Sequence, residues 1–358
     1  MTSPNNESGA MLSIATIDDL ACRIASMWNA YNQDRTNALK MSEEARQYVF
    51  ATDVETTSAA QLPHKNRTHQ PKLTQISDNL QSQYWEASLG TPQFFKYDGQ
   101  TEKDRQRAHK MEAWVRTKLE AKKFRSTVGR QLIADYVNYG NFFASVDYVV
   151  ETDDNGKIMY QGPVIERISP LDQVFNPRAE SFPKSPKITR KLIHIAELKD
   201  MPSKYPTSGF IDTKIAECIA TRSPTIVNDW VQVLKDRGLS MDGFGSYNDY
   251  FRQDLIELLI YRGDVFNPVT GETQRNRVLY VVDRCHVIRN ESSVSPRGFD
   301  GMHHAGWRVR NDNLWAQGPL DNIVGMQYRI DHLENLRADV FDLIAHPVLL
   351  LRGGSWLL

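Results

Sequence analysis

The chain has 358 residues, 41% hydrophobic and 24% charged, so it is long enough for two or three domains with an ordinary buried core. Its 43 basic and 44 acidic side chains give a formal net charge of −1, which argues against tight global binding of DNA through its phosphates. No run approaches the roughly 20 apolar residues of a membrane span, and the start lacks the pattern of a secretory signal. Cys22, Cys218 and Cys285 are far apart, so we expect buried reduced thiols in a cytoplasmic chain.

The first part of the chain is predicted to be mainly helical. Residues 1–16 are polar, and we expect a flexible N-terminus there. Pro71 suits the first turn of a helix, where its missing N–H has no cost. The expected N-terminal helical region, 17–139, contains a helix at 17–50, a loop at 51–67, a helix at 71–89, a strand at 94–97 and a charged helix at 102–139.

The charged helix at 102–139 has more basic than acidic side chains. A nucleic-acid patch is one interpretation of this excess, and a solvated helix face is the other. We favour the solvated face, because acidic residues are interleaved with the basic ones. The acids are Glu102, Asp104, Glu112 and Glu120.

Residues 140–310 are predicted to form a β-rich mixed region. Alternating β-branched and aromatic residues favour strands, and the Asp153–Lys157 segment has the composition of a hairpin turn. The expected strands lie at 141–150, 158–160, 164–168, 254–263, 277–283 and 285–290. A turn at 169–172 leads into 173–177, and a further strand leading into a short helix is expected at 186–201. Helices are expected at 211–222 and 224–236, a flexible connection at 238–250 and a loop at 298–307.

The last region, 311–358, is predicted to be a long amphipathic helix followed by a terminal strand. Pro319 would open the helix, and the helix must end before Pro347. Apolar residues recur at steps of three and four, which indicates one buried stripe. The members of this stripe are Leu320, Ile323, Met326, Ile330, Leu333, Leu336, Val340 and Ile344. The opposite side, a candidate subunit-interface or channel-facing surface, carries Asp321, Tyr328, His332, Asn335, Asp339 and Asp342.

These two sides of the helix predict opposite mutational effects. Leu333→Ala should lower the free energy of unfolding by roughly 2–5 kcal/mol if its side chain is buried. His332→Ala or Asn335→Ala should cost under about 0.5 kcal/mol if those side chains are at the surface.

A search for catalytic and ligand-binding motifs finds none, so we expect no catalytic residues, no cofactor and no metal. Gly243 and Gly245 lie outside a strand-to-helix turn, and the acidic loop at Asp153 lacks the glutamate of a calcium site. His303 and His304 have no further ligand at metal spacing. Two alternatives stay open: a non-catalytic protein-binding scaffold, and a metal-dependent nucleic-acid-processing enzyme. The enzyme would place Asp147, Glu166 and Asp172 around its metal.

Several segments resemble the portal proteins, or head-to-tail connectors, of short-tailed bacteriophages. The closest are DYVNYGNFFASVDYV at 135–149 and GPVIERISPLDQVFNPRAESF at 162–182. The remaining similar residues are Asp78–Leu80, Ser82–Trp85, Trp315, Gly318–Leu320, Gln327, Asp331–Asn335 and Ala345–Pro347.

This resemblance implies a fold and a function. The fold would be an α+β wing of long helices packed with antiparallel hairpins, ending in a long amphipathic helix. The chain would form a dodecameric ring at the capsid vertex, through which DNA is packaged and ejected. Its partners would be the terminase motor, capsid and scaffolding proteins, a tail adaptor, and double-stranded DNA bound weakly without sequence specificity. It would reside in the virion, and in the host cytoplasm during assembly. Because portal proteins continue beyond the point that corresponds to Leu358, we expect a truncation after the wing, with the stem missing.

Overall fold

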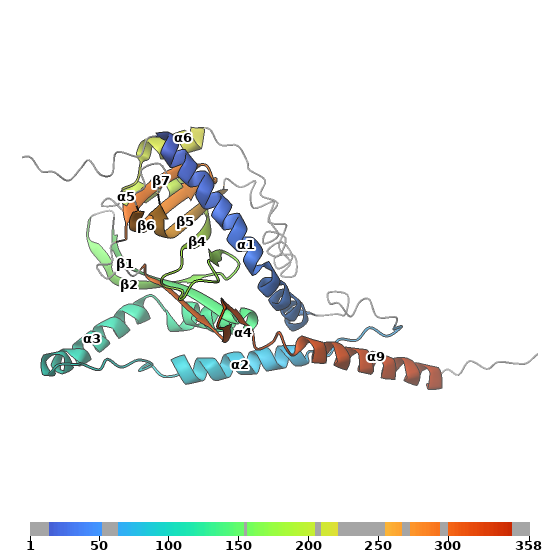
Figure 1. Ribbon diagram of the computed structural model, residues 1–358. Helices are drawn as coiled ribbons and strands as arrows, with labels where there is room; N and C mark the ends of the chain where they lie inside the picture. The colour runs from blue at the N-terminus through green and yellow to red at the C-terminus, as the bar shows by residue number, and fades with distance from the viewer. Residues whose placement is uncertain are drawn as a thin grey trace, which may run out of the picture.

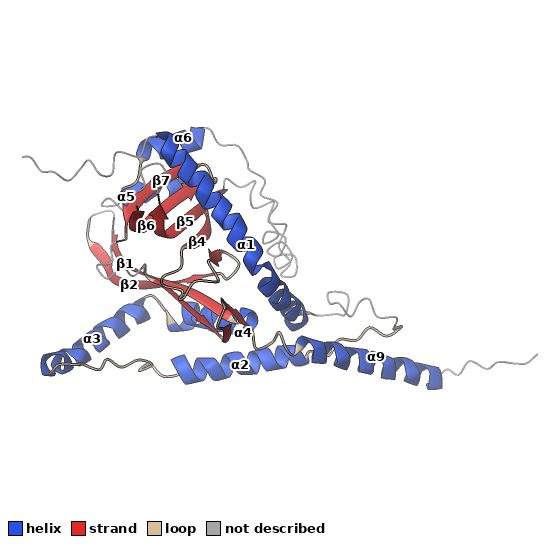
Figure 2. Cartoon of the chain, in the orientation of Figure 1, coloured by secondary structure: helices blue, strands red, loops and turns tan. Residues whose placement is uncertain are grey.

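The computed structural model describes residues 14–51, 64–153, 156–204, 209–220, 255–266, 273–293 and 300–345. The described chain combines helices with antiparallel sheets, which confirms the expected α+β class (Figures 1 and 2). Residues 1–13, the expected helix at 224–236, the connection at 238–250 and the terminal strand lie outside the described residues. No described helix is both long enough and apolar enough to span a bilayer.

A five-stranded antiparallel sheet forms the larger core. Its strands are β3 (Gln173–Phe175), β4 (Lys187–His194), β5 (Leu255–Phe266), β6 (Thr273–Val282) and β7 (His286–Ser292), in that spatial order. Both faces of the sheet are covered. Helix α1 (Ile14–Phe50) packs on one face, and α5 (Ile195–Lys204) and α6 (Asp212–Ala220) pack on the other. Side chains alternate between the faces, so Leu259 and Leu279 point toward α1, while Leu258 and Val282 point away from it.

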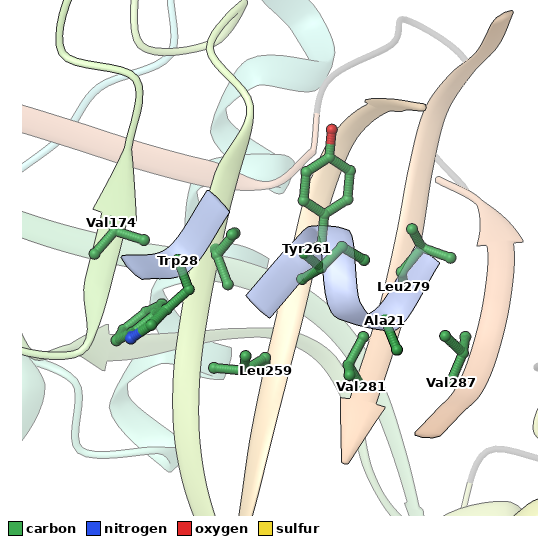
Figure 3. Close-up of a cluster of buried hydrophobic side chains, with 10 residues drawn as sticks. Ala21, Trp28, Val174, Leu259, Tyr261, Leu279, Val281 and Val287 are labelled. Carbon is green, nitrogen blue, oxygen red and sulfur yellow. The ribbon is translucent and has the colours of Figure 1, made fainter. Parts of the chain in front are cut away.

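Helix α1 (Ile14–Phe50) runs diagonally across its face of the sheet (Figure 1). Ala21, Ile24 and Trp28 recur at steps of three and four, which places them on one side of the helix. Figure 3 shows Ala21 and Trp28 among the sheet residues Val174, Leu259, Tyr261, Leu279, Val281 and Val287, where the helix crosses the strands. The helix expected at 17–50 is therefore confirmed, with its start at Ile14.

A second, smaller sheet lies below the first in Figure 1, and it pairs two strands from the middle of the chain with one from its last quarter. It has the order β2-β1-β8, with β1 (Asn141–Thr152), β2 (Ile158–Ile168) and β8 (Met302–Gly306). A short ribbon of β9 (Arg308–Arg310) and β10 (Asn313–Gln317) follows. Phe143, Phe175 and Trp315 join these strands to the rest in one buried aromatic cluster.

Two expectations for this region are wrong. Residues 302–306 form a strand where a loop was expected, and residues 313–317 form a strand at the start of the expected helical region. The first is wrong because β8 pairs with β1, which lies more than 150 residues away along the chain. A prediction from local pattern uses only about one strand's length of sequence, so it does not detect this pairing. The two strands expected at 158–160 and 164–168 are one strand, β2.

The lower layer is helical, and one of its helices is shorter than expected. Helix α2 (Lys72–Leu89) agrees with the prediction. The expected helix at 102–139 instead comprises α3 (Glu102–Ala121), a π-helical turn η3 (Arg125–Gly129) and α4 (Arg130–Tyr139). The break occurs at Lys123, whose φ of 52° is left-handed.

Two further features of this layer come from packing. The expected strand at 94–97 is absent from the structure, where these residues are irregular and Phe94 stacks on Phe124. Gly140 ends α4 with a φ of 67°, and a Cβ atom there would lie 2.5 Å from the backbone of Gly318. A glycine is therefore required both for the left-handed cap and for the close approach of the two chain segments.

Helix α9 (Val324–Ala345) is the last described element, and it begins after a turn at 319–323 rather than at Pro319. It continues away from the body beyond the end of α2, opposite to α3 (Figure 1). Its first turn packs with α1, α2 and α4 through Leu320 and Val324.

All three cysteines are free thiols. Cys218 is buried as expected, but Cys22 and Cys285 are exposed, which corrects that part of the prediction.

Candidate functional site: helix α9 and the strap at residues 64–70

The two sides of α9 are reversed relative to the sequence prediction. Met326 and Ile344 are 65% and 68% exposed, and Leu333 is 51% exposed. Leu336 and Val340 are exposed as well, Ile323 and Ile330 are half-buried, and among the predicted stripe Leu320 alone is fully buried. The buried side of the helix instead carries Gln327, Asp331 and Asn335. The prediction of a buried apolar stripe is therefore wrong for this chain.

The physical reason is an extended segment, residues 64–70, that lies along the polar side of α9. We call this segment the strap. Asn335 binds the strap at both backbone groups of one residue: its Oδ1 accepts from the Thr68 amide at 2.7 Å, and its Nδ2 donates to the Thr68 carbonyl at 3.1 Å. A carboxamide carries an acceptor oxygen and a donor nitrogen side by side. It can therefore hydrogen-bond to the backbone N–H and C=O of one residue, as a neighbouring strand does.

Gln327 repeats this interaction two turns earlier on the helix. Its Oε1 accepts from the amide of Leu73 at 3.0 Å, and its Nε2 donates to the carbonyl of Gln70 at 2.6 Å. Both carboxamides lie on the side of α9 that faces the strap, since 327 and 335 are eight residues apart. The polar side chains of α9 thus bind the backbone of the strap, which explains why they are buried without a loss of hydrogen bonding.

Asp331 is the central acceptor of this contact and is fully buried. Its carboxylate accepts from the Gln70 amide at 3.0 Å, from Gln327 Nε2 at 3.0 Å and from His69 Nδ1 at 2.9 Å. The His69 side chain is 3% exposed, and its Nε2 has no hydrogen-bond partner among the described residues. The three donors satisfy the buried carboxylate of Asp331, which would otherwise be costly to keep in the interior.

The distal part of the strap is held by Asp339 and Asp342. Asp339 accepts from the Asn66 amide at 2.9 Å and from the Lys65 amide at 3.2 Å, while Asp342 accepts from Asn66 Nδ2 at 2.8 Å. The bond from the Asn66 amide, followed by those from Lys65 and His64, lowers the pKa of Asp339, so the group remains a carboxylate in mildly acidic solution.

His64 and His332 add a pair of imidazoles at this end. His64 Nδ1 lies 3.2 Å from Asp339 Oδ2, and His64 Nε2 lies 2.8 Å from His332 Nδ1.

The structure places the six residues that were predicted to face a neighbour or the channel as follows. His332, Asn335, Asp339 and Asp342 contact the strap, Tyr328 is 38% exposed, and Asp321 accepts from the Gly318 amide at 2.8 Å. Burial is the main cause that raises the pKa of Asp321.

Two of the three acids of the alternative enzyme site pair with separate cations. Glu166 pairs with Lys191 at 3.0 Å, and Asp172 pairs with Arg190 at 3.3 Å. Asp147 lies in β1 opposite Val164. In the part of the chain that the structure describes, no three His, Cys, Asp or Glu residues form a group suited to a metal ion.

The basic side chains of α3 and of the segment that joins it to η3 are partly paired as well. Arg116 bonds to Glu112 at 2.9 Å, and Lys122 bonds to Glu151 at 2.7 Å while lying over the ring of Tyr160. A hollow of about 610 Å³ beside the start of α1 is lined by both signs of charge, including Arg23, Arg277 and Asp264. Neither surface brings together the residues of a recognisable chemistry.

His304 is half-buried against the aromatic cluster, where it stacks on aromatic rings. It stacks on Phe143 at 4.8 Å, and its Nε2 lies 3.1 Å from Asn141 Oδ1. Burial lowers its pKa from 6.5 to about 4. Between these two values the unfolded chain binds more protons at this residue than the folded chain does. Stability should therefore rise with pH through this window and be lost as the pH falls through it.

We expect this histidine to contribute about 3 kcal/mol of the loss in unfolding free energy on acidification from neutral pH to pH 4. The measurement is urea unfolding of wild type and His304→Gln across this pH range. The variant should have a flatter pH dependence than wild type. His303→Gln, at the exposed neighbouring position, serves as the control and should leave the slope unchanged. An unchanged slope in His304→Gln would contradict the assignment.

Sequence reasoning missed the strap because its residues, HKNRTHQ, show no helical or strand periodicity. One signal did point to it. Gln327, Asp331, Asn335 and Asp339 are spaced by four residues, and such a row of side chains with hydrogen-bond acceptors can bind an extended backbone. Comparison of the sequence with models of protein families finds no match, and comparison with curated proteins finds none either.

Proposed function

We propose that this chain is a subunit of a bacteriophage portal ring, which joins head to tail and through which DNA passes. The proposal is supported by the portal-like segments at 135–149 and 162–182 and by the mixed α+β architecture with antiparallel sheets. The observation that carries the assembly part of the proposal is the exposed apolar side of α9. We call this side the outer face of α9; its members are Met326, Leu333, Leu336, Val340, Phe341, Leu343 and Ile344.

The outer face of α9 needs a partner for a simple reason. A contiguous apolar surface on a helix gains free energy when it leaves water, at about 25 cal/mol per Å². In this chain the polar side of α9 is already occupied by the strap, so the helix cannot turn its apolar side inward without breaking those hydrogen bonds. Exposed apolar patches of this kind mark protein interaction sites.

A second copy of the chain is the partner that fits a ring. Helix α9 extends from one end of the molecule, whereas α3 lies at the other (Figure 2). A contact between α9 of one copy and a different surface of the next copy would be heterologous, and contacts of this type form a ring when the rotation between copies closes. Assembly through α9 would also place several copies of the same helix around one axis, as a channel requires. Partners such as a motor, capsid proteins and a tail adaptor belong to the same proposal.

The test is assembly measured by sedimentation velocity and electron microscopy of the purified chain. Wild type should form closed rings. Leu333→Glu should weaken assembly at least about a hundredfold in dissociation constant, because burying an unpaired carboxylate costs several kcal/mol and each 1.4 kcal/mol is tenfold. Met111→Glu changes an equally exposed apolar residue on α3 and serves as the matched control.

Four outcomes would contradict the proposal. A wild-type chain that stays monomeric at tens of micromolar would exclude assembly through α9. This concentration is about a thousandfold above the dissociation constant of a contact with a Kd of about 10 nM. A compact dimer would favour a protein-binding scaffold over a ring. Hydrolysis of DNA that depends on Mg²⁺ or Mn²⁺ would favour the enzyme alternative. Nanomolar binding of duplex DNA at physiological salt would also disagree, since DNA must slide through a portal channel.

A further inference from the structure

We propose that His64 and His332 form a pH-sensitive latch that holds the first half of the strap on α9 and opens when both imidazoles are protonated. The latch joins two segments that are 268 residues apart in sequence. It depends on contacts inside one chain and is independent of the proposed function.

The geometry of the pair requires that one nitrogen donates and the other accepts. His64 Nε2 and His332 Nδ1 are 2.8 Å apart, with ring centroids separated by 4.8 Å and tilted by 50°. The other nitrogen of His64 lies 3.2 Å from Asp339 Oδ2, and the His64 side chain is 8% exposed. A distance of 2.8 Å is that of a good hydrogen bond, which holds one proton between the two nitrogens.

Successive protons have opposite effects on this arrangement. With one imidazolium, His64 donates from Nδ1 to Asp339 and from Nε2 to the lone pair of His332 Nδ1, so every contact is kept. A second proton on His332 places an N–H opposite an N–H, removes the acceptor and brings two positive charges into contact. Imidazoles are the side chains whose charge ordinarily changes between pH 5 and 8, so the test below spans this range.

The surrounding charges do not compensate for the second proton. Among the described residues, Asp339 is the acid that contacts the latch directly, and it already accepts from two backbone amides. The other charged or titratable groups near this contact are Tyr328, Arg329, Asp331, Glu334 and Asp342 on α9, Lys65, Arg67 and His69 on the strap, and Tyr48 on α1, whose ring lies 6.2 Å from that of His69. Asp331 is bound to His69, and Asp342 to Asn66.

Opening should be confined to one half of the strap. The amides of Lys65 and Asn66 bind Asp339 beside the latch. The amides of Thr68 and Leu73 bind the carboxamides of Asn335 and Gln327, which do not titrate. Acidification should therefore release residues 64–66 and the adjoining part of α9, while the contacts at Thr68 and Leu73 remain.

Amide hydrogen exchange, corrected for the intrinsic rate at each pH, tests the latch on the full chain. From about pH 7.5 to about pH 5, protection of the Lys65 and Asn66 amides should fall roughly tenfold, while protection at Leu73 stays the same. His332→Asn keeps a group that can bond to His64 Nε2 but cannot take a proton, so this variant should retain its protection at acid pH. His109→Asn on the exposed surface of α3 is the matched control and should behave as wild type.

The result is decisive in either direction. Equal loss of protection in wild type and His332→Asn would show that the pair is not the titrating element and would overturn the proposal. Unchanged protection in wild type would overturn it too. Retained protection at Leu73 in every variant verifies that the chain is folded. Since exchange is read within one chain, failure of the latch would be distinguishable from failure of ring assembly.

Discussion

Trp28→Ala should lower the free energy of unfolding by about 3–5 kcal/mol, the largest single-residue effect that we expect. The Trp28 side chain is fully buried between α1 and the five-stranded sheet, and it packs with Val174, Ile188 and Leu259 (Figure 3). Its ring also lies 5.4 Å from the guanidinium of Arg35 and 5.5 Å from that of Arg190. Truncation would leave a cavity beneath α1 and remove the aromatic face from two buried cations.

The matched control is Trp114→Ala on α3. Trp114 is 44% exposed and lies outside the buried clusters, so the same chemical change should cost under about 1 kcal/mol. Both variants are measured by chemical denaturation with fluorescence and circular dichroism. If the two substitutions destabilise the chain equally, α1 does not pack on the sheet as described.

The second large effect is expected on the polar side of α9. Asp331→Ala should cost about 2–4 kcal/mol, because it leaves the Gln70 amide, Gln327 and His69 without their buried acceptor. Asn335→Ala should cost about 1–3 kcal/mol through the two backbone groups of Thr68. Thermal and urea unfolding measure both changes.

Leu333→Ala provides the contrast on the same helix. Its side chain is exposed in the single chain, so we expect a loss below about 0.5 kcal/mol in unfolding free energy at concentrations where the chain is monomeric. Asp331→Ala should thus destabilise the chain more than Leu333→Ala, whereas the helical periodicity alone predicts a larger loss for the apolar residue. A larger loss for Leu333→Ala than for Asp331→Ala would mean that the apolar side of α9 is buried within the chain and that the strap is misplaced.

Local patterns predicted those elements whose residues carry their own signal. The helices at 17–50 and 71–89 and the strands around 141–150, 254–263 and 277–283 agree with α1, α2, β1, β5 and β6 to within a few residues at most ends. Their apolar residues recur at the helical or strand period, and this period follows from backbone geometry alone. The terminal turn of α4 was also readable, because Gly140 is the residue that a left-handed cap requires.

Elements that depend on a distant partner were not predictable in this way. Strand β8 exists because β1 offers it a hydrogen-bonding edge, and the break at Lys123 lets Phe124 reach Phe94. The candidate site shows the same dependence. His332, Asn335, Asp339 and Asp342 were correctly grouped on one side of α9 by their spacing, but the side that faces the protein interior was assigned wrongly.

The sequence by itself determined that this chain is an α+β protein with a long amphipathic helix near residue 330, because composition and period depend on neighbouring residues only. The tertiary structure alone decided which side of that helix is buried. Periodicity separates an apolar side from a polar side, but burial follows from the available partner. Here the partner is the strap, an extended backbone that needs hydrogen bonds, and Gln327, Asp331 and Asn335 supply them while the apolar side is left for contacts outside the fold.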